Sequence, residues 1–362
     1  MNQRVEKAVL TIGPKYLPPR GGIAQTLYFY EKFIFSKFNY VANSCDGSIL
    51  AKVWCLIAAI TKCTIKLLFD RNIKIVHIHS ASNFSFRRSV WFLELAKLFG
   101  KKVIMHIHGG GFEKYYNTKP ECIAKQLNKA DCVVALSKQW NDFFSLRVGL
   151  KRVITINNVV PKATIIPQRK QTPLHVLYLG LISEKKGVYD LIEAIGRHAN
   201  VFVGKVVIHL AGKGNENDIS RMDELIVRYR LQQTVVFEGW VAGDQKNSLL
   251  EESSVFILPS YYEGLPISIL EAMAAGMAIL ATKVGGIPSI VTEGENGLLF
   301  EPGDIEQIAD SLEQLLLNRQ LRCAMGEKSL QMITQFFPDA VENQLENLYR
   351  QILSTNYDSK KN

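Results

Sequence analysis

Short apolar runs alternate with longer amphipathic segments along most of this chain of 362 residues. Apolar runs bounded by turn-forming residues are typical of strands that are buried on both faces, as in parallel sheets. Successive parallel strands need a long crossover connection, which is usually a helix. The alternation therefore predicts an α/β protein with open, mostly parallel sheets covered by helices. In such sheets ligands bind beyond the carboxyl ends of the strands.

The alternation is interrupted once, over 157–173, by a polar segment that contains three prolines. Because 362 residues exceed what one core usually supports, we expect two domains, over 1–165 and 172–335, and a last segment over 336–362. The expected strands are 8–12, 73–79, 102–108, 132–136 and 153–156 in the first domain, and 174–179, 206–211, 235–237, 255–258 and 278–281 in the second. The clearest expected helices are 23–37, 49–69, 87–99, 304–317 and 340–353.

The stretch 254–300 carries the most specific pattern. A strand ends before Glu263, and Pro266 opens a helix that stops at Gly276. The N–H groups of Gly264, Leu265 and the first helical turn would form a phosphate site at the positive end of the helix dipole. Glu263 precedes this helix start and Glu271 lies about one and a half turns into the helix, so the two carboxylates bracket the site.

These residues resemble a known signature. Two glutamates eight residues apart around Gly264-Leu265-Pro266, followed by Glu-Ala-Met-Ala-Ala-Gly, are similar to the motif of retaining family 4 glycosyltransferases. The resemblance implies a GT-B fold, in which two Rossmann-like domains with parallel sheets face across a cleft and the chain's end crosses back to the first domain. It also implies that Glu263 contacts the donor sugar and that Glu271 holds the ribose hydroxyls. If the resemblance is set aside, the simpler interpretation is that Glu263 caps a helix and that Glu271 is a solvated helix residue.

A second loop, within 178–195, places Gly180 after a strand and Lys186 before a helix. The resembling family has an arginine directly after this glycine, and that arginine and the lysine bind the donor diphosphate. Lys186 matches the lysine, but Leu181 stands where the arginine should be, so a bidentate phosphate contact is lost. Lys185 or Arg20 are the candidates to replace it.

Three further segments carry expectations from the resemblance. Gly21 and Gly22 would face the donor diphosphate, His108 in the His-Ile-His-Gly-Gly-Gly-Phe segment would line the acceptor side, and Gly239-Trp240-Val241 would line the nucleobase pocket. A buried core tryptophan is an equal alternative for Trp240. The His-Gly-Gly-Gly turn also resembles a lipase oxyanion loop, but no serine has glycine two residues before it, which excludes the nucleophile elbow of that class.

Two His-x-His pairs, at 77 and 79 and at 106 and 108, could in principle bind a metal. Neither segment contains an acidic residue, and no two aspartates stand two apart as in the Asp-x-Asp motif of metal-dependent enzymes. We therefore expect no metal ligands and no cofactor. Helix starts and Lys186 would neutralise the diphosphate instead.

Charge is distributed unevenly along the chain. Residues 1–170 contain 27 lysines and arginines against 9 acidic residues, a net charge of +18, whereas residues 171–362 carry a net charge of −9. This polarity, with aromatic and basic residues interleaved over 84–102, predicts that the first half docks on an anionic membrane surface rather than on nucleic acid. The helix 49–69 is amphipathic, and we expect it to pack on a sheet rather than to lie in a membrane.

Six cysteines without a C-x-x-C pair and the absence of an apolar leader lead us to expect a cytoplasmic protein with reduced thiols. The charge polarity adds the expectation that it binds peripherally to the inner face of the cell membrane. The activity that the resemblance implies is retaining, metal-independent hexosyl transfer from a nucleotide-diphospho-sugar, UDP-linked in preference to GDP-linked. Together with the charge polarity, the resemblance also implies a glycan acceptor, preferentially a lipid-linked one, in surface polysaccharide assembly of the O-antigen or capsule type. Two alternatives remain, a nucleotide-sugar epimerase of the same fold and a non-catalytic glycosyltransferase-like subunit.

Overall fold

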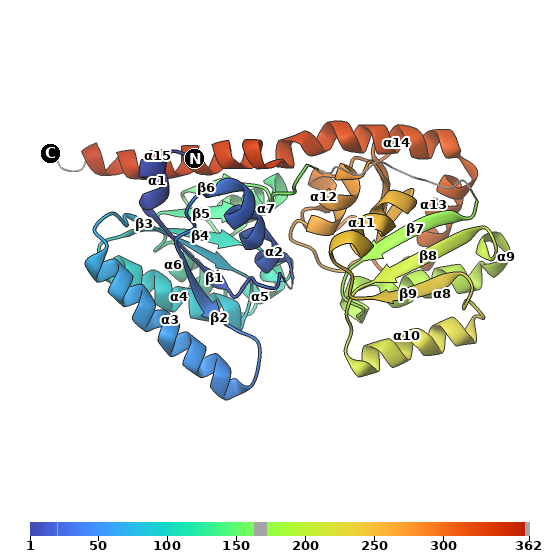
Figure 1. Ribbon diagram of the computed structural model, residues 1–362, viewed down its shortest axis with the longest axis horizontal. Coiled ribbons are helices and arrows are strands. Elements are labelled where there is room, and N and C mark those ends of the chain that lie inside the picture. The colour runs from blue at the N-terminus through green and yellow to red at the C-terminus, as the bar shows by residue number, and fades with distance from the viewer. Residues whose placement is uncertain (20, 163–171, 359–362) are drawn as a thin grey trace. The chain divides into compact units, whose positions relative to one another are not determined.

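The computed structural model describes residues 1–19, 21–162 and 172–358, with side chains up to residue 354. The chain divides into two compact units, which are described separately. Unit 1 comprises Met1–Pro161 and Phe336–Asn362, and unit 2 comprises Lys162–Gln335. Each unit contains a six-stranded, all-parallel sheet between layers of helices (Figure 1).

The sheet of unit 1 has the order β2-β1-β3-β4-β5-β6. Its central strands are almost wholly apolar and buried, because helices cover both faces of the sheet. Successive strands are added to one side of β1 up to β2 and to its other side from β3 onward, so the strand order reverses between β1 and β3. Ligands bind at such a switch point in open α/β sheets. The strands are β1 (Val9–Pro14), β2 (Tyr40–Ser44), β3 (Ile75–Ser80), β4 (Lys102–Ile107), β5 (Cys132–Ala135) and β6 (Val153–Thr155).

Helices of unit 1 connect these strands, and α15 from the end of the chain joins them. α15 contacts β3, α1 and the π-helix that continues α2, so residues more than 300 apart in sequence belong to one unit. The helices are α1 (Gln3–Lys7), α2 (Gly22–Phe29) with its π-helical extension Tyr30–Ile34, α3 (Ile49–Phe69), α4 (Phe84–Leu98), α5 (Phe112–Tyr116), α6 (Pro120–Leu127), α7 (Lys138–Asp142) with the π-turn Phe143–Arg147, and α15 (Pro338–Asp358).

The sheet of unit 2 has the order β12-β11-β10-β7-β8-β9, with its switch point between β7 and β10. Val176 and Leu177 of β7 pair with Val255 and Phe256 of β10 at the centre of this sheet. The strands are β7 (Leu174–Leu179), β8 (Val206–Ala211), β9 (Val235–Gly239), β10 (Val255–Leu258), β11 (Ala278–Thr282) and β12 (Gly297–Phe300).

Helices of unit 2 follow the same alternation, and the longest amphipathic ones bury one apolar stripe against the sheet. They are α8 (Val188–Arg197), α9 (Ala199–Phe202), α10 (Glu216–Arg228), α11 (Gly243–Glu252), α12 (Ile267–Ala274), α13 (Ile305–Leu317) and α14 (Arg319–Met332), with short 3₁₀ turns at Glu184–Lys186, Ile287–Ser289 and Ile333–Phe336. Within the described residues, no helix is both long and apolar enough to cross a bilayer.

Two strands were absent from the sequence expectation. β2 is an edge strand whose residues alternate between partly buried and buried, and β12 is a four-residue edge strand that follows a polar turn. β2 lacks the continuous apolar run that marks a central strand, whereas β12 consists of a short run of this kind, Gly-Leu-Leu-Phe, and was missed all the same. The predicted segment 157–173 coincides with the change from unit 1 to unit 2, but its residues 163–171 lie outside those that the structure describes.

Candidate active site

The loops that follow β7 and β10 are neighbours, because these two strands pair at the switch point of unit 2. The first loop contains Gly180, Leu181 and Lys186, and the second contains Glu263. Most of the predicted donor residues therefore lie at the carboxyl edge of one sheet, where a parallel α/β fold places its ligands.

Lys186 and Glu263 form an ion pair, with Nζ 2.5 Å from Oε1. The Glu263 side chain is 8% exposed and that of Lys186 is 21% exposed, so the pair is largely removed from solvent. Gly187, directly after the lysine, has a φ of +68° and begins α8. A Cβ here would overlap the carbonyl oxygen of Pro259, so glycine is required for the two loops to approach each other.

The backbone of Glu263 is held by the turn after β11. Gly285 has a φ of +54°, and a Cβ on it would overlap the carbonyl oxygen of Glu263. The N–H of Gly286 donates a 2.7 Å hydrogen bond to the carbonyl of Gly264. Gly264, Leu265 and Pro266 are consequently buried, whereas exposed N–H groups were expected there.

The helix after this loop begins where the sequence predicts, with Pro266 as the N-cap and Gly276 in the left-handed region after its end. Among the described residues, no side chain caps its amino terminus. Glu271, in its second turn, pairs with Lys246 of α11 at 2.8 Å. No sequence signal singled out Lys246, which lies 25 residues before its partner.

The β7 loop shows how the chain accommodates leucine in place of the family's arginine. The buried Tyr178 hydroxyl donates to the carbonyl of Leu181 at 2.7 Å, and the Leu181 side chain is 47% exposed. Burial, followed by the nearby Glu263 carboxylate, raises the pKa of Tyr178 well above its usual value, so this hydroxyl stays a donor. Of the two proposed substitutes, Lys185 is exposed and Arg20 lies outside the described residues.

Gly239 is the last residue of β9, and Trp240 and Val241 follow it, beside the loops after β7 and β8. Gly212 donates a 2.7 Å hydrogen bond to the carbonyl of Gly239, which has a φ of +67°. Val241 is buried, but Trp240 is 47% exposed, so the alternative of a core tryptophan is wrong. The Nζ of Lys213 lies 5.3 Å from the centre of the Trp240 ring, a cation–π contact.

In unit 1, the predicted residues lie around the switch point of the other sheet. Gly21 and Gly22 are exposed at the start of α2, where Gly21 has a φ of +92°. Thr26 in the same helix hydrogen-bonds the carbonyl of Gly22 and the Asn158 side chain. His108 is partly buried directly after β4, and its Nε2 lies 2.9 Å from Nδ1 of His79.

Four histidines, His77, His79, His106 and His108, form a ladder across β3 and β4. Burial lowers the pKa of His77 to about 3 and that of His108 to about 3, with a hydrogen bond from Asn158 opposing the shift at His108. Burial also lowers the pKa values of His79 and His106 well below the usual value. All four rings are therefore neutral at pH 7, and His77 is anchored by the Tyr349 hydroxyl at 2.8 Å.

Potential ligand nitrogens of His77, His79 and His106 lie within 4.8 Å of one another. The rings of His77 and His106 stack, since their planes differ by 5° with centroids 5.3 Å apart, whereas the rings of His77 and His79 are tilted by 32°. A tetrahedral metal needs in-plane lone pairs that point to one centre. The stacked pair of His77 and His106 presents parallel lone pairs and does not meet this requirement.

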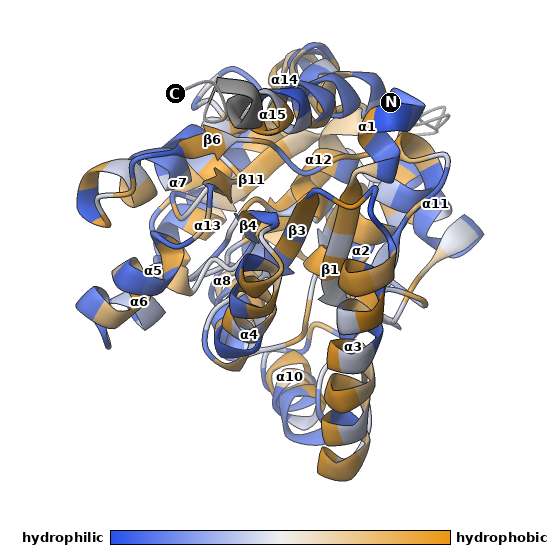
Figure 2. Ribbon diagram, turned by 90° about the vertical axis from the view of Figure 1, so that its left-hand side faces the viewer, coloured by the Kyte–Doolittle hydropathy of each residue, from blue (hydrophilic) through white to orange (hydrophobic). Residues whose placement is uncertain are grey.

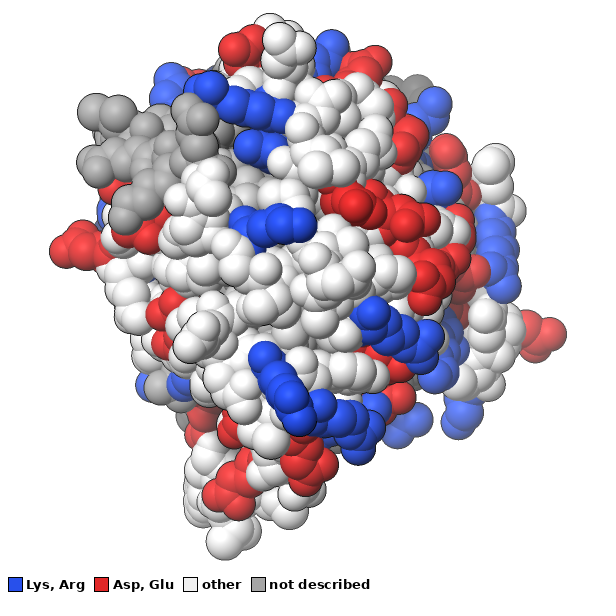
Figure 3. Space-filling model, turned by 90° about the vertical axis from the view of Figure 1, so that its right-hand side faces the viewer, with Lys and Arg blue, Asp and Glu red and all other residues white. Residues whose placement is uncertain are grey.

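Only some side chains of the segment 84–102, which is predicted to face a membrane, are exposed for such a contact. Phe86 and Phe92 belong to the core, and the amines of Lys97 and Lys102 both pair with Asp131. Phe84, Trp91 and Leu98 are exposed. Figure 3 draws a different face of the molecule, on which both acidic and basic side chains are exposed.

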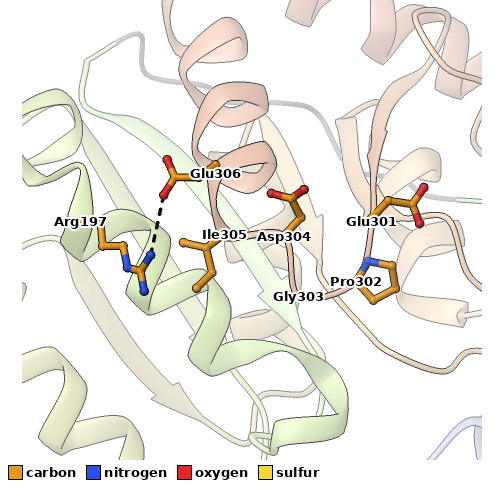
Figure 4. Close-up of a pocket in the computed structure, with 7 residues that line it drawn as sticks. All are labelled: Arg197, Glu301, Pro302, Gly303, Asp304, Ile305 and Glu306. Carbon is orange, nitrogen blue, oxygen red and sulfur yellow. Dashed lines mark ion pairs between the residues drawn. The ribbon is translucent and has the colours of Figure 1, made fainter.

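A hollow lined by Arg197 and residues 301–306 lies elsewhere in unit 2 (Figure 4). In the figure, the side chains of Arg197 from α8 and Glu306 from α13 point toward each other, and their ion pair spans 3.8 Å. The residues that line it include none of the predicted donor residues. It is separate from the candidate active site.

The chain is similar to known glycosyltransferases in sequence and in fold. Residues 162–332 match the family described as glycosyl transferases group 1. The matched part covers nearly the whole of unit 2 and includes Lys186, Glu263 and Glu271. Over 247 residues the chain is 28% identical to N-acetyl-alpha-D-glucosaminyl L-malate synthase of Bacillus anthracis, a match of 65% of this chain and 63% of that protein.

A second relative is the lipopolysaccharide core biosynthesis glycosyltransferase LpsE of Rhizobium meliloti, which is 30% identical over 50% of this chain and 49% of its own length. The chain thus matches about half to two thirds of the length of these relatives.

Among solved structures, sucrose-phosphate synthase from Thermosynechococcus elongatus superposes with a TM-score of 0.77 at 19% identity, covering 96% of this chain and 99% of that one. Anabaena HepE in complex with UDP gives 0.74 at 16% identity, with the same coverage. The chain has the GT-B fold.

Proposed function

We propose that this GT-B chain is a glycosyltransferase that moves a sugar from a nucleotide-diphospho-sugar to a glycan acceptor with retention of configuration. The observation that carries the proposal is the pair formed by Lys186 and Glu263 at the switch point of unit 2, between the starts of α8 and α12. A lysine and two helix starts suit a diphosphate, and a carboxylate beside them suits sugar hydroxyls.

In this proposal no side chain acts as a nucleophile. The bond between the sugar's anomeric carbon and the phosphate oxygen breaks while the acceptor oxygen bonds to the same face of that carbon. The acceptor's proton passes to the departing phosphate oxygen. Lys186 stabilises the charge that develops on the diphosphate, Glu263 orients the sugar, and His108 lines the acceptor side.

Glu271 is proposed to bind the ribose hydroxyls. Its ion pair with Lys246 would either be replaced by this contact or be kept alongside it. Gly239, Trp240 and Val241 would line the nucleobase pocket, with the exposed Trp240 ring as a stacking surface. Gly21 and Gly22 would approach the diphosphate from unit 1. A uridine nucleotide is favoured, because the similar HepE fold was solved with UDP.

The acceptor is proposed to be a lipid-linked glycan in surface polysaccharide assembly, with the enzyme on the cytoplasmic side of an anionic membrane. The relative LpsE, named for lipopolysaccharide core biosynthesis, supports this assignment, as does the net charge of +18 over residues 1–170. Metal independence is part of the proposal, since Lys186 and the helix starts supply positive charge to the diphosphate.

Incubation of the full chain with a panel of nucleotide-sugars, with and without glycan acceptors, tests the activity. Acceptor-dependent release of nucleoside diphosphate, unchanged by EDTA, is the expected result. A new nucleotide-sugar formed without acceptor would indicate the epimerase instead. Neither product from any donor, with no nucleotide binding by calorimetry, would indicate the non-catalytic subunit.

A further inference from the structure

Helix α3 packs on unit 1 through one side only. Ala59, Cys63 and Leu67 are buried in the core of unit 1, with Leu56 and Ile60 packed against them. The first six residues of the helix, 49–54, are all exposed. In Figure 1 this amino-terminal part projects beyond the sheet of unit 1.

The side of α3 that faces away from the sheet is apolar. Its outward positions recur every three or four residues, the spacing of one helix face. Leu50 is 73% exposed, Trp54 70% and Phe69 73%, and Figure 2 colours long stretches of the α3 ribbon as hydrophobic. The exposed large apolar residues of α3 are Ile49, Leu50, Val53, Trp54, Ile57, Ile65, Leu68 and Phe69.

Such a surface is unusual for a helix in contact only with water. Isolated exposed apolar residues are common, but a continuous apolar face marks an interaction site. The expectation that this helix packs on a sheet is confirmed for the face that contains Ala59, Cys63 and Leu67, and the opposite face is exposed and mostly apolar.

The charges of α3 select the partner. The helix contains three lysines, at 52, 62 and 66, and no acidic residue. At about 100° per residue, Lys62 and Lys66 lie on one flank, between the outward apolar face and the buried face, and the Lys66 amine also donates to Asn39 at 2.7 Å. Lys52 lies in line with the buried residues, but in the exposed first turns of the helix. Lysines beside an apolar face with a tryptophan are typical of helices that lie in the interface of an anionic bilayer.

Helix α4, which contacts α3, carries a second exposed apolar row. Phe84, Trp91 and Leu98 are spaced by seven residues, so they lie on one side of this helix. Arg87, next to this row, is also exposed. The two helices together present apolar side chains accompanied by cations.

We infer that α3 is a membrane-docking helix, whose outward face inserts into the headgroup region of an anionic phospholipid bilayer. The inference deepens the proposed function, because it rests on the placement of that function at a membrane and assigns the contact to a defined helix. It also changes the expected binding mode. Burial of apolar side chains supplies affinity that salt does not screen, and the lysines add selectivity for anionic lipid.

Co-sedimentation of the full chain with vesicles of phosphatidylcholine, with and without phosphatidylglycerol, tests this inference. The chain should pellet with the anionic vesicles, and high salt should weaken the binding without abolishing it. The double variant Leu50→Glu/Trp54→Glu places two charges on the inserted face and should lower partitioning by about tenfold or more. Leu146→Glu, at an 81% exposed leucine elsewhere in unit 1, is the matched control and should bind like the unmodified chain.

Tryptophan fluorescence gives a second readout. Anionic vesicles should shift the emission to shorter wavelength, and Trp54→Phe should remove most of this shift while retaining binding. Equal pelleting of the double variant and the unmodified chain would overturn the inference, as would a lipid-free dimer by sedimentation velocity that the same variant dissociates. In either case the proposed transferase is judged separately, by nucleoside diphosphate binding and by transfer to a soluble acceptor. Vesicle binding without any transfer would instead refute only the proposed function.

Discussion

The Nζ of Lys186 lies 2.5 Å from Oε1 of Glu263, although 77 residues separate the two in the chain. A nucleotide-sugar bound between the loops after β7 and β10 would meet both groups at once. The cation would face the diphosphate and the carboxylate would face the sugar. This pair therefore leads to the first two predictions.

Lys186→Ala should lower turnover by about 10²–10³-fold, the usual cost of removing one group that stabilises developing negative charge. The matched control is Lys205→Ala, which deletes an exposed lysine directly before β8, at the amino edge of the same sheet, and should change turnover less than threefold (~0.6 kcal/mol). Steady-state release of nucleoside diphosphate provides the measurement. Turnover of Lys186→Ala equal to that of the control would disprove the phosphate assignment.

Glu271→Ala and Glu263→Ala should affect different steps. Loss of the charged acceptor at Glu271 should weaken binding of the bare nucleoside diphosphate by ~1.5–3 kcal/mol, whereas Glu263→Ala should leave that affinity nearly unchanged and depress turnover. Calorimetry with the nucleoside diphosphate separates the two. Lys246→Ala removes the partner of Glu271 and serves as the control for its ion pair. Equal losses of affinity in both glutamate variants would contradict the division of roles.

Leu181→Arg should strengthen donor binding. The Leu181 side chain is 47% exposed, and its backbone is held by the Tyr178 hydroxyl, so a longer side chain can extend into solvent without displacing the loop. A charge-assisted contact with the diphosphate should improve affinity by ~1.5 kcal/mol, about tenfold. Leu181→Gln, long but uncharged, should give little gain. If both variants bind alike, the diphosphate does not lie beside this position.

Gly285→Ala should perturb the active-site loop, whereas Gly294→Ala should not. Both glycines have positive φ, so alanine costs roughly 1–2 kcal/mol of backbone strain at either position. Only at Gly285 does the added Cβ also overlap the carbonyl oxygen of Glu263, whereas Gly294 has open space around it. Thermal denaturation and turnover together provide the measurement. We expect both variants to lose stability, Gly285→Ala more so, and only Gly285→Ala to lose activity by more than the loss of folded protein explains.

The histidine ladder should make the protein sensitive to acid. The pKa values of His77, His79, His106 and His108 are lowered in the folded state, so below the unfolded value of about 6.5 the unfolded chain binds protons that the folded chain does not. Stability is therefore fully present above pH 6.5 and falls as the pH decreases. Each such histidine contributes a slope of up to ~1.4 kcal/mol per pH unit down to its folded pKa.

His106→Leu provides the test of this slope. Neither ring nitrogen of His106 has a hydrogen-bond partner among the described residues, so leucine should maintain or raise stability at pH 7. Urea denaturation of this variant should show a pH slope between 6 and 4 that is smaller by up to about 1.4 kcal/mol per unit. His198→Leu, at a partly exposed histidine of unit 2, is the comparison. An unchanged slope in His106→Leu would show that this ring does not resist protonation.

The sequence alone determined the parallel α/β class and most central elements, because each buried strand is a continuous apolar run and each crossover helix has its own periodicity. The bounds of β7, β8, β10 and α3 agree with those expected, and the GT-B fold is confirmed. The edge strand β2 was missed because its residues alternate in burial and form no apolar run, and the short apolar run of β12 was missed as well.

Only the tertiary structure decided which residues share a site. Lys246 meets Glu271, Gly285 supports the backbone of Glu263, and Tyr349 reaches His77 from a helix 272 residues away, none of which a local pattern encodes. The same holds for α3, whose sequence is apolar on more than one side and cannot indicate which side packs on the sheet. Local propensity arises from neighbours along the chain, whereas ion pairs, close glycine contacts and the exposed face of a helix arise from segments that meet only after folding.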